Sequence, residues 1–282
     1  MKRSEQIKKI INLALSEDIG KGDITSLATI GSKQKAIGKF LVKDNGIIAG
    51  LSIAKQVMKS VEKKITFKVL IEDGSEVKSG DIVAEVSGNA RSILSAERTA
   101  LNFIQRMSGI ATGASIYAKA VLHTKAKVID TRKTAPGLRL IDKMAVKIGG
   151  CDNHRFGLYD MFLIKDNHIE VAGSITKAVD ACRKFMRKKK KKFLIEVETK
   201  NLAEVQEALN CKADIIMLDN FEIEEMKKAV QLINGNCKVE ASGGVNLSTI
   251  KSIAETGVDY ISVGGLTHSV KALDISLEIM PL

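Results

Sequence analysis

The sequence has no tryptophan, only 4% aromatic residues and no two cysteines in CxxC spacing. Its four cysteines lie far apart, which argues against a zinc site or a disulfide scaffold and fits a reducing compartment. There is no run of about 18 apolar residues, so no membrane span is predicted. The basic N-terminus continues into an amphipathic helix, not into the apolar stretch of a signal peptide. We therefore expect a soluble, cytoplasmic protein.

Positive charge is in excess, with 44 lysines and arginines against 33 acidic residues and a net charge of +11. Part of this excess is a basic run at 187–192, between an expected helix and an expected strand. Blocks of like charge usually remain solvated, and we assign this one no function. Nucleic-acid binding is the alternative, but the scarcity of aromatics and the lack of a recognition motif do not favour it.

The chain of 282 residues suits one large domain or two smaller ones. Its first part combines an amphipathic N-terminal helix with strand-like runs at 36–42, 65–71 and 82–86, which predicts a small β-rich domain. A long helical stretch follows at 91–123, with Gly109 and Gly113 as candidate break points. The segment IEDGSEVKSGDIVAEVSG looks like the hairpin of a lipoyl or biotinyl carrier domain. The usual context for modification of Lys78 is missing, so a carrier is a weak alternative.

From residue 127 onward, strand patterns alternate with helical patterns such as 202–209 and 223–233. This alternation predicts parallel strands joined by right-handed crossovers. Six units are fewer than the eight of a complete barrel, so a doubly wound sheet remains an alternative on pattern alone. The candidate strands are 127–130, 161–164, 193–197, 214–218, 238–241 and 259–263.

Charged residues and paired glycines follow every one of these strands, in DTRKT, IKDNH, EVET, LDN, SGG and VGG. In a βα barrel the functional groups come from the carboxyl ends of several strands. Several basic side chains at one barrel mouth would repel each other unless an anion compensated their charge. Arginine forks suit carboxylates and phosphates, and lysine suits phosphate. The sequence therefore predicts an anion site that includes Arg132, Lys133, His154, Arg155, Lys165 and His168.

The last two strands end in glycine pairs that allow close approach of a phosphate to backbone N–H groups. We expect Ser242, Gly243 and Gly244, with Gly264 and Gly265, to bind phosphate, and His268 to reach the same group.

Two carboxylates, Glu198 and Asp219, end adjacent strands and fit magnesium held together with a polyphosphate. The alternative is an internal ion pair with Lys133 or Lys165. Glu196 precedes Glu198 on the same strand, and we expect only one of the two to face the barrel mouth. Glu198 is our choice because it lies nearer the carboxyl end.

Taken in order, these segments resemble the quinolinate phosphoribosyltransferase family over nearly the whole chain. The combination of TRKT, PG and R with the loop NHRFGLYD and the segment IKDNH is the specific part of the resemblance. Two departures are visible: Cys151 stands where the family usually has a third glycine, and Met144 replaces a frequent tyrosine. Neither removes a charge. The matching segments are LSEDIGKGDITS, ERTALNFIQRMSGIAT, DTRKTAPGLR, NHRFGLYDMFLIKDNHI, IEVETKN, IMLDNF, EASGGV and GVDYISVGGLTHS.

The resemblance implies an N-terminal α/β sandwich domain at 1–108 and an incomplete α/β barrel at 109–268, with 269–282 packing on the first domain. It implies phosphoribosyl transfer from phosphoribosyl pyrophosphate to quinolinate with decarboxylation, in a magnesium-dependent dimer or hexamer. A related enzyme that uses another aromatic acid is the nearest alternative.

The resemblance also implies residue roles. Arg132, His154 and Arg155 would grip the quinolinate carboxylates, and Arg98 would reach into the neighbouring subunit's site, although its helical position alone predicts a solvated residue. Lys133 and Lys165 would hold phosphoribosyl pyrophosphate, with Glu198 and Asp219 near its ribose and the magnesium. The 5-phosphate would lie on Ser242, Gly243, Gly244, Gly264, Gly265 and His268.

Overall fold

The structure is a computed structural model that describes residues 2–282. Its chain forms two compact units. The first unit contains the residues through Ser115 together with Thr134–Gly150 and Leu266–Leu282, and the second contains Ile116–Lys133 and Cys151–Gly265.

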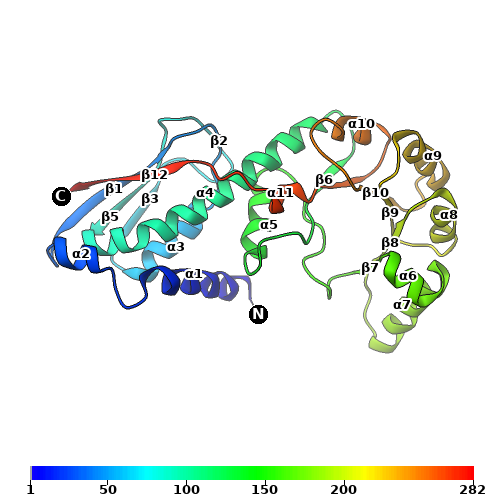
Figure 1. The fold of residues 1–282 in the computed structure, drawn as a ribbon, viewed down its shortest axis with the longest axis horizontal. Helices are drawn as coiled ribbons and strands as arrows, with labels where there is room; N and C mark the ends of the chain where they lie inside the picture. Colours follow the sequence, from blue (N-terminus) through cyan, green and yellow to red (C-terminus); the bar gives the residue numbers. More distant parts are fainter. Residues whose placement is uncertain (1) are drawn as a thin grey trace. The chain divides into compact units, whose positions relative to one another are not determined.

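The first unit is built on a four-stranded sheet with the order β12-β1-β5-β3. Alternate residues of β1 are buried, with Phe40 and Val42 fully enclosed, because successive side chains of a strand point to opposite faces. The C-terminal strand β12 pairs antiparallel with β1 from Ala36↔Pro281 to Val42↔Ile275 and forms one edge of the sheet (Figure 1). The elements of this unit are α1 (Arg3–Ile19), α2 (Ile24–Thr29), β1 (Lys35–Val42), β2 (Gly46–Ile47), α3 (Leu51–Val61), β3 (Thr66–Val69), β4 (Glu76–Val77), β5 (Ile82–Asn89), most of α4 (Ala90–Ala120), α5 (Arg139–Ile148), most of α11 (Gly265–His268) and β12 (Ile275–Pro281).

The long helix α4 is continuous, so the expected break near Gly109 or Gly113 is wrong. At Gly109, a Cβ atom would collide with the backbone carbonyl of Lys271. This glycine therefore allows the segment before β12 to pass close to the helix. The N–H of Leu273 donates to the Gln105 carbonyl at 3.0 Å, one helical turn before Gly109.

A buried ion pair in the first unit joins α4 to α5. Both Nε and Nη2 of Arg106 donate to Asp142 at 2.8 Å, and the Asp142 side chain is 0% exposed. Asp142 also accepts a hydrogen bond from the backbone N–H of Ala135 at 3.3 Å. The pair thus fixes two helices and the segment that leads into α5.

Asp142→Ala is expected to lower the free energy of unfolding by about 3–5 kcal/mol, because it leaves the Arg106 charge without its partner. Urea titration would measure the loss. Glu278→Ala is a matched control, since it removes the solvent-exposed partner of Lys43 and should cost at most about 1 kcal/mol. If the two variants lost the same free energy of unfolding, the stabilising role of the Arg106–Asp142 pair would be contradicted.

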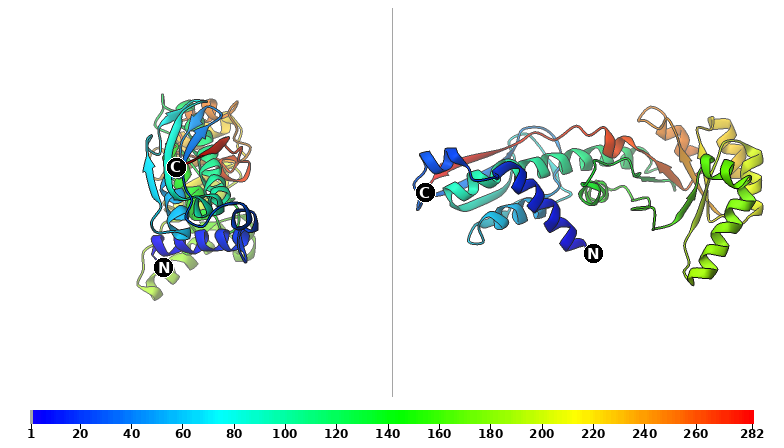
Figure 2. Two further views of the ribbon diagram at one scale, coloured as in Figure 1. Left: turned by 90° about the vertical axis from the view of Figure 1, so that its left-hand side faces the viewer. Right: turned by 60° about the horizontal axis from the view of Figure 1, so that its bottom comes forward.

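The second unit contains a parallel six-stranded sheet with the order β6-β11-β10-β9-β8-β7. All the strands expected from the sequence are present, with ends displaced by one or two residues. Six strands with helices outside them form an incomplete barrel, which confirms the expected fold class (Figures 1 and 2). The elements of this unit are β6 (Lys127–Ile129), β7 (Phe162–Ile164), α6 (Asp166–Ala172), α7 (Ile175–Lys189), β8 (Ile195–Thr199), α8 (Leu202–Asn210), β9 (Ile215–Asp219), α9 (Ile223–Ile233), β10 (Lys238–Ser242), α10 (Ile250–Glu255) and β11 (Tyr260–Ser262).

The spacing of Glu196 and Glu198 on β8 corrects the reason given for choosing between them. Residues two apart on a strand share a face, so Glu196 and Glu198 both point to the same side. Both are buried, at 0% and 7% exposure. The alternation used to choose between them therefore does not apply, because residues two apart on a strand do not alternate. The choice of Glu198 as the one that faces the barrel mouth stays a prediction.

Within residues 2–282, no helix has both the length and the apolar character needed to cross a bilayer. The four cysteines are free thiols. The basic run at 187–192 begins in the last turn of α7 and continues past it, and all of its residues are exposed.

Candidate active site

The sheet register aligns the polar strand ends of the second unit. Glu198 is opposite Met217, and Asp219, two residues later on β9, is opposite Ser242 of β10. Paired residues of neighbouring strands lie on one face of a sheet, as do residues two apart. Glu198, Asp219 and Ser242 therefore share the same face at the carboxyl ends of adjacent strands.

A buried arginine, Arg155, and a half-buried one, Arg132, create a positive region. Arg155 is 9% exposed, and its Nη1 donates to the Met161 carbonyl at 3.2 Å. Its buried Nε has no hydrogen-bond partner among residues 2–282. Burial and the nearby Arg132 charge both lower the pKa of Arg155, while Glu196 and Asp160 raise it. A buried guanidinium with an unused donor beside a second guanidinium is suited to an anionic ligand.

The loop that carries His154 and Arg155 is fixed by the buried side chain of Asp130, which follows β6. Asp130 accepts a hydrogen bond from the His154 backbone N–H at 2.8 Å and is 0% exposed. The backbone of the loop also forms a parallel bridge from Asp152 to Ile129 of β6. The loop is therefore attached to the barrel at its strand end, which places Arg155 near Arg132.

Cys151 precedes this loop and is 3% exposed. Burial, Asp130 and Asp152 raise the pKa of its thiol to about 12. The thiol therefore stays protonated at neutral pH, so the residue at this departure from the family pattern adds no charge to the loop.

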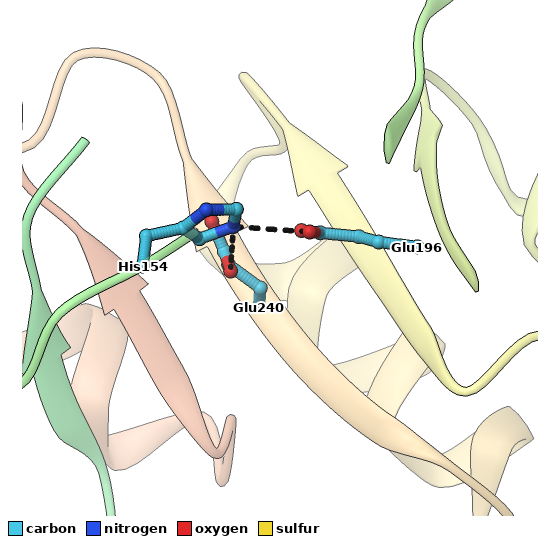
Figure 3. A group of neighbouring side chains, drawn as sticks. All are labelled: His154, Glu196 and Glu240. Atoms are coloured by element: carbon cyan, nitrogen blue, oxygen red, sulfur yellow. Dashed lines mark hydrogen bonds and ion pairs between the residues drawn. The ribbon is translucent and has the colours of Figure 1, made fainter. Parts of the chain in front are cut away.

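The His154 side chain points into a buried pair of carboxylates (Figure 3). Its Nε2 lies 3.0 Å from Glu196 on β8 and 3.4 Å from Glu240 on β10. Burial alone would lower the pKa of His154, but the two carboxylates raise it to about 10. Burial and the Glu240 charge raise the pKa of Glu196, and His154 opposes that shift.

Lys165 and Glu198 form an ion pair of 2.6 Å at the ends of β7 and β8. The internal pairing considered from the sequence is therefore present. Lys165 also precedes α6, and its backbone N–H donates to Nδ1 of His168 at 3.0 Å. A neighbouring pair, Lys200 and Asp166, lies 3.1 Å apart. Glu198 lines a cavity of about 250 Å³ together with Asp166, Asn167, Ile169, Glu170, Lys200 and Glu204.

Asn220 shapes the ends of β9 and β10. Its side-chain amide donates to Asp219 at 2.9 Å, and its backbone N–H donates to the Ser242 carbonyl at 2.9 Å. Gly243 has φ +89°, and a Cβ there would collide with the Asn220 side chain. Glycine is therefore required at this turn by both its backbone conformation and the close approach of Asn220.

The remaining predicted site residues are divided between the ends of the barrel strands and the first unit. Lys133 is exposed after β6, and Gly264 and Gly265 follow β11. Arg98 on α4 and His268 on α11 belong to the first unit, and both are exposed. The sequence reasoning missed the buried acids Asp130 and Glu240 and assigned no role to Glu196.

Two family models match the chain: the N-terminal domain of quinolinate phosphoribosyl transferase at residues 23–108 and the C-terminal domain of the same enzyme at residues 110–278. The chain belongs to the quinolinate phosphoribosyltransferase family. The resemblance inferred from the sequence motifs is thus confirmed.

Relatives in this family match almost all of the chain. A chloroplastic nicotinate-nucleotide pyrophosphorylase [carboxylating] from Oryza sativa is 50% identical over 97% of this chain and 77% of its own length. A probable nicotinate-nucleotide pyrophosphorylase [carboxylating] from Bacillus subtilis is 42% identical over 97% of this chain and 93% of its own length. The crystal structure of NadC from Streptococcus pyogenes matches with a TM-score of 0.94 and 39% identity over 98% of this chain and 97% of that chain.

Proposed function

We propose that this enzyme transfers the phosphoribosyl group of phosphoribosyl pyrophosphate to quinolinate and releases CO₂, pyrophosphate and nicotinate mononucleotide. Membership of the quinolinate phosphoribosyltransferase family supports this reaction. The observation in the structure that carries it is the buried Arg155, whose unused Nε lies beside the positive charge of Arg132. A dicarboxylic acid would supply the anionic groups that two such cations require.

In this proposal Arg132, His154 and Arg155 bind the two carboxylates of quinolinate. Arg98 is exposed on α4 and would complete the site of a second copy in a dimer or hexamer. A guanidinium fork can hold a carboxylate through two parallel hydrogen bonds, which fixes the orientation of the pyridine ring as well as its position.

Phosphoribosyl pyrophosphate would bind through Lys133 and Lys165. Its 5-phosphate would lie against Ser242, Gly243, Gly244, Gly264, Gly265 and His268. The consecutive positive φ values of Gly243 and Gly244, +89° and +59°, support this part of the proposal, because such a turn can direct backbone N–H groups toward an anion.

Glu198 and Asp219 would hold Mg²⁺ together with the pyrophosphate. An all-oxygen set of one or two carboxylates plus phosphates is the usual magnesium environment, and the sheet register places Glu198 and Asp219 on one face at the ends of adjacent strands. When bound, Mg²⁺ would neutralise the charge of the departing pyrophosphate.

The chain's residues would act mainly by positioning and electrostatics. The arginine clamp orients the quinolinate nitrogen, whose lone pair forms a bond to the anomeric carbon while the bond to pyrophosphate breaks. Alignment of two reactants contributes about 7–11 kcal/mol to such reactions. Lys165 would stabilise the leaving oxygens, and Glu198 and Asp219 the positive charge that develops on the ribose.

Decarboxylation follows from the charge of the new pyridinium. The bond to the 2-carboxylate breaks, its electron pair stays on the ring carbon next to the positive nitrogen, and that carbon takes up a proton. No covalent intermediate with the enzyme is required.

The test is product formation from phosphoribosyl pyrophosphate and Mg²⁺, with quinolinate and nicotinate as parallel acids. Nicotinate mononucleotide and CO₂ from quinolinate alone are expected. Product from nicotinate, or from neither acid, would contradict the proposal and favour a related enzyme acting on another aromatic acid. We also propose a cytoplasmic location, which the free cysteines support.

A further inference from the structure

His154, Glu196 and Glu240 form a buried cluster in the second unit, and Glu196 also interacts electrostatically with Arg155. Glu196 comes from β8 and Glu240 from β10, and both are 0% exposed. Their carboxylates approach the same ring nitrogen, Nε2 of His154 (Figure 3). A single neutral histidine would need only one acceptor at that nitrogen.

Two buried acids on one histidine are costly to maintain without a compensating charge. Glu196 Oε1 and both Glu240 oxygens have no hydrogen-bond partner among residues 2–282. Burial of an ionised carboxylate is unfavourable unless it is paired with a cation or hydrogen-bonded. Nε2 of His154 lies 3.0 Å from Oε2 of Glu196 and 3.4 Å from Oε2 of Glu240, so a protonated ring would supply a cation to both acids.

We propose that Glu196 and Glu240 are positioning residues that keep His154 as an imidazolium in a fixed ring orientation for the substrate acid. A protonated ring carries N–H donors on both nitrogens. Nε2 is directed to the two glutamates, and Nδ1 then remains a donor on the opposite edge of the ring. The proposal rests on the binding of quinolinate by His154.

Other charged groups surround the histidine. Asp130 holds its backbone N–H at 2.8 Å, and Arg155 follows it in the chain with Arg132 nearby. Burial disfavours a positive charge on the ring. The glutamate pair opposes that effect, and this is consistent with the raised pKa of His154, about 10.

A purely electrostatic role and a positioning role of the glutamates predict opposite effects of their neutralisation on the binding of the substrate acid. If the two glutamates were only negative charges near an anion site, their neutralisation would strengthen the binding of a dianion. If they hold the imidazolium, their neutralisation removes a cation from the site and weakens binding. The direction of the change therefore separates the two roles.

The first measurement uses the full-length wild-type enzyme without substrates. The protonation of the histidine rings is measured by ¹⁵N NMR at about pH 8. This pH lies between the ordinary histidine pKa of about 6.5 and the pKa of about 10 for His154. The chain has 4 histidines, so the spectrum of His154→Gln identifies the signal. Protonation of both ring nitrogens is expected, and a neutral ring would overturn the proposal.

The second measurement is the KM for each substrate in Glu196→Gln, Glu240→Gln and the double variant at the same pH. We expect the KM for quinolinate to rise about 10-fold or more in the double variant, with the KM for phosphoribosyl pyrophosphate unchanged. An unchanged or lower KM for quinolinate would overturn the proposal.

Glu255→Gln is the matched control, because Glu255 also pairs with a histidine, His123, at 3.2 Å on the surface. It should change neither KM. The metal content of the purified enzyme should also be measured, because His154, Glu196 and Glu240 are close enough together to hold a cation. A stoichiometric divalent metal that wild type retains and His154→Gln loses would replace the positioning role with a metal site.

Failure of the proposed reaction is distinguishable from failure of this inference. His154→Gln with unchanged quinolinate affinity would remove His154 from the acid site, whatever the glutamates do. A protonated ring in the free enzyme, lost in the glutamate variants, would establish the imidazolium cluster even if the enzyme used another acid.

Discussion

Arg132→Ala is expected to weaken quinolinate binding by at least about 100-fold while leaving the fold intact. The proposed clamp places a guanidinium fork on a carboxylate, and each hydrogen bond to a charged group contributes about 1.5–3 kcal/mol. Loss of both bonds therefore costs about 3 kcal/mol or more, which is a factor of about 100 in affinity. Calorimetric titration with quinolinate measures this directly, without turnover.

Arg187→Ala provides the control, because Arg187 begins the basic run at the end of α7 to which we assign no function. It removes the same side chain and the same charge from the protein as a whole, so it corrects for the long-range effect of net charge. Quinolinate affinity should remain at the wild-type value in this variant. Unchanged affinity in Arg132→Ala, with the thermal unfolding temperature preserved, would remove Arg132 from the clamp.

The barrel strands could be predicted because buried parallel strands have a simple sequence signal. Each of the six contains buried apolar residues and is followed by polar residues or glycines, and the structure displaces the strand ends by only one or two residues. Gly109 had no such unambiguous signal. A glycine inside a helical pattern indicates either a break or a close packing contact, and only the position of Lys271 in the folded chain decides between them.

The acidic residues of the site show where sequence reasoning was limited. Glu198 and its partner Lys165 were found because each directly follows or ends a strand. Glu196 and Glu240 lie further inside β8 and β10, where apolar residues are the usual occupants. Their two-residue spacing from Glu198 and Ser242 was the available signal, since that spacing places them on the same face. Their shared contact with His154 depends on tertiary structure alone.

The role of Arg98 rests on the family resemblance alone, and that of His268 on the resemblance and on its place after the last glycine pair. Both are exposed residues of the first unit, and exposed charged side chains carry no sequence signal that separates a binding role from simple solvation. They stay predictions that a complex with both substrates would test.

Glu198→Gln is expected to lower kcat by about 10²- to 10³-fold and to raise the magnesium concentration required for half-maximal rate. The carboxylate is 7% exposed and pairs with Lys165 at 2.6 Å. It could therefore act by holding Lys165 in place, or by binding the metal and stabilising the positive charge that develops on the ribose. Removal of one preorganised charge near a reacting centre typically costs that much in kcat. Quinolinate affinity should not change.

The variant Lys165→Met and the double variant separate these roles. If Glu198 only positions Lys165, the double variant will be no slower than Lys165→Met and will need no more magnesium than it does. If Glu198 acts on the metal and the ribose, the double variant will be slower still and the magnesium requirement will rise. Glu224→Gln is the control for the loss of an ion pair as such, because Glu224 pairs with Lys227 at 2.7 Å on the exposed face of α9. Its rate and its magnesium requirement should both equal those of the wild type, since exposed pairs contribute little.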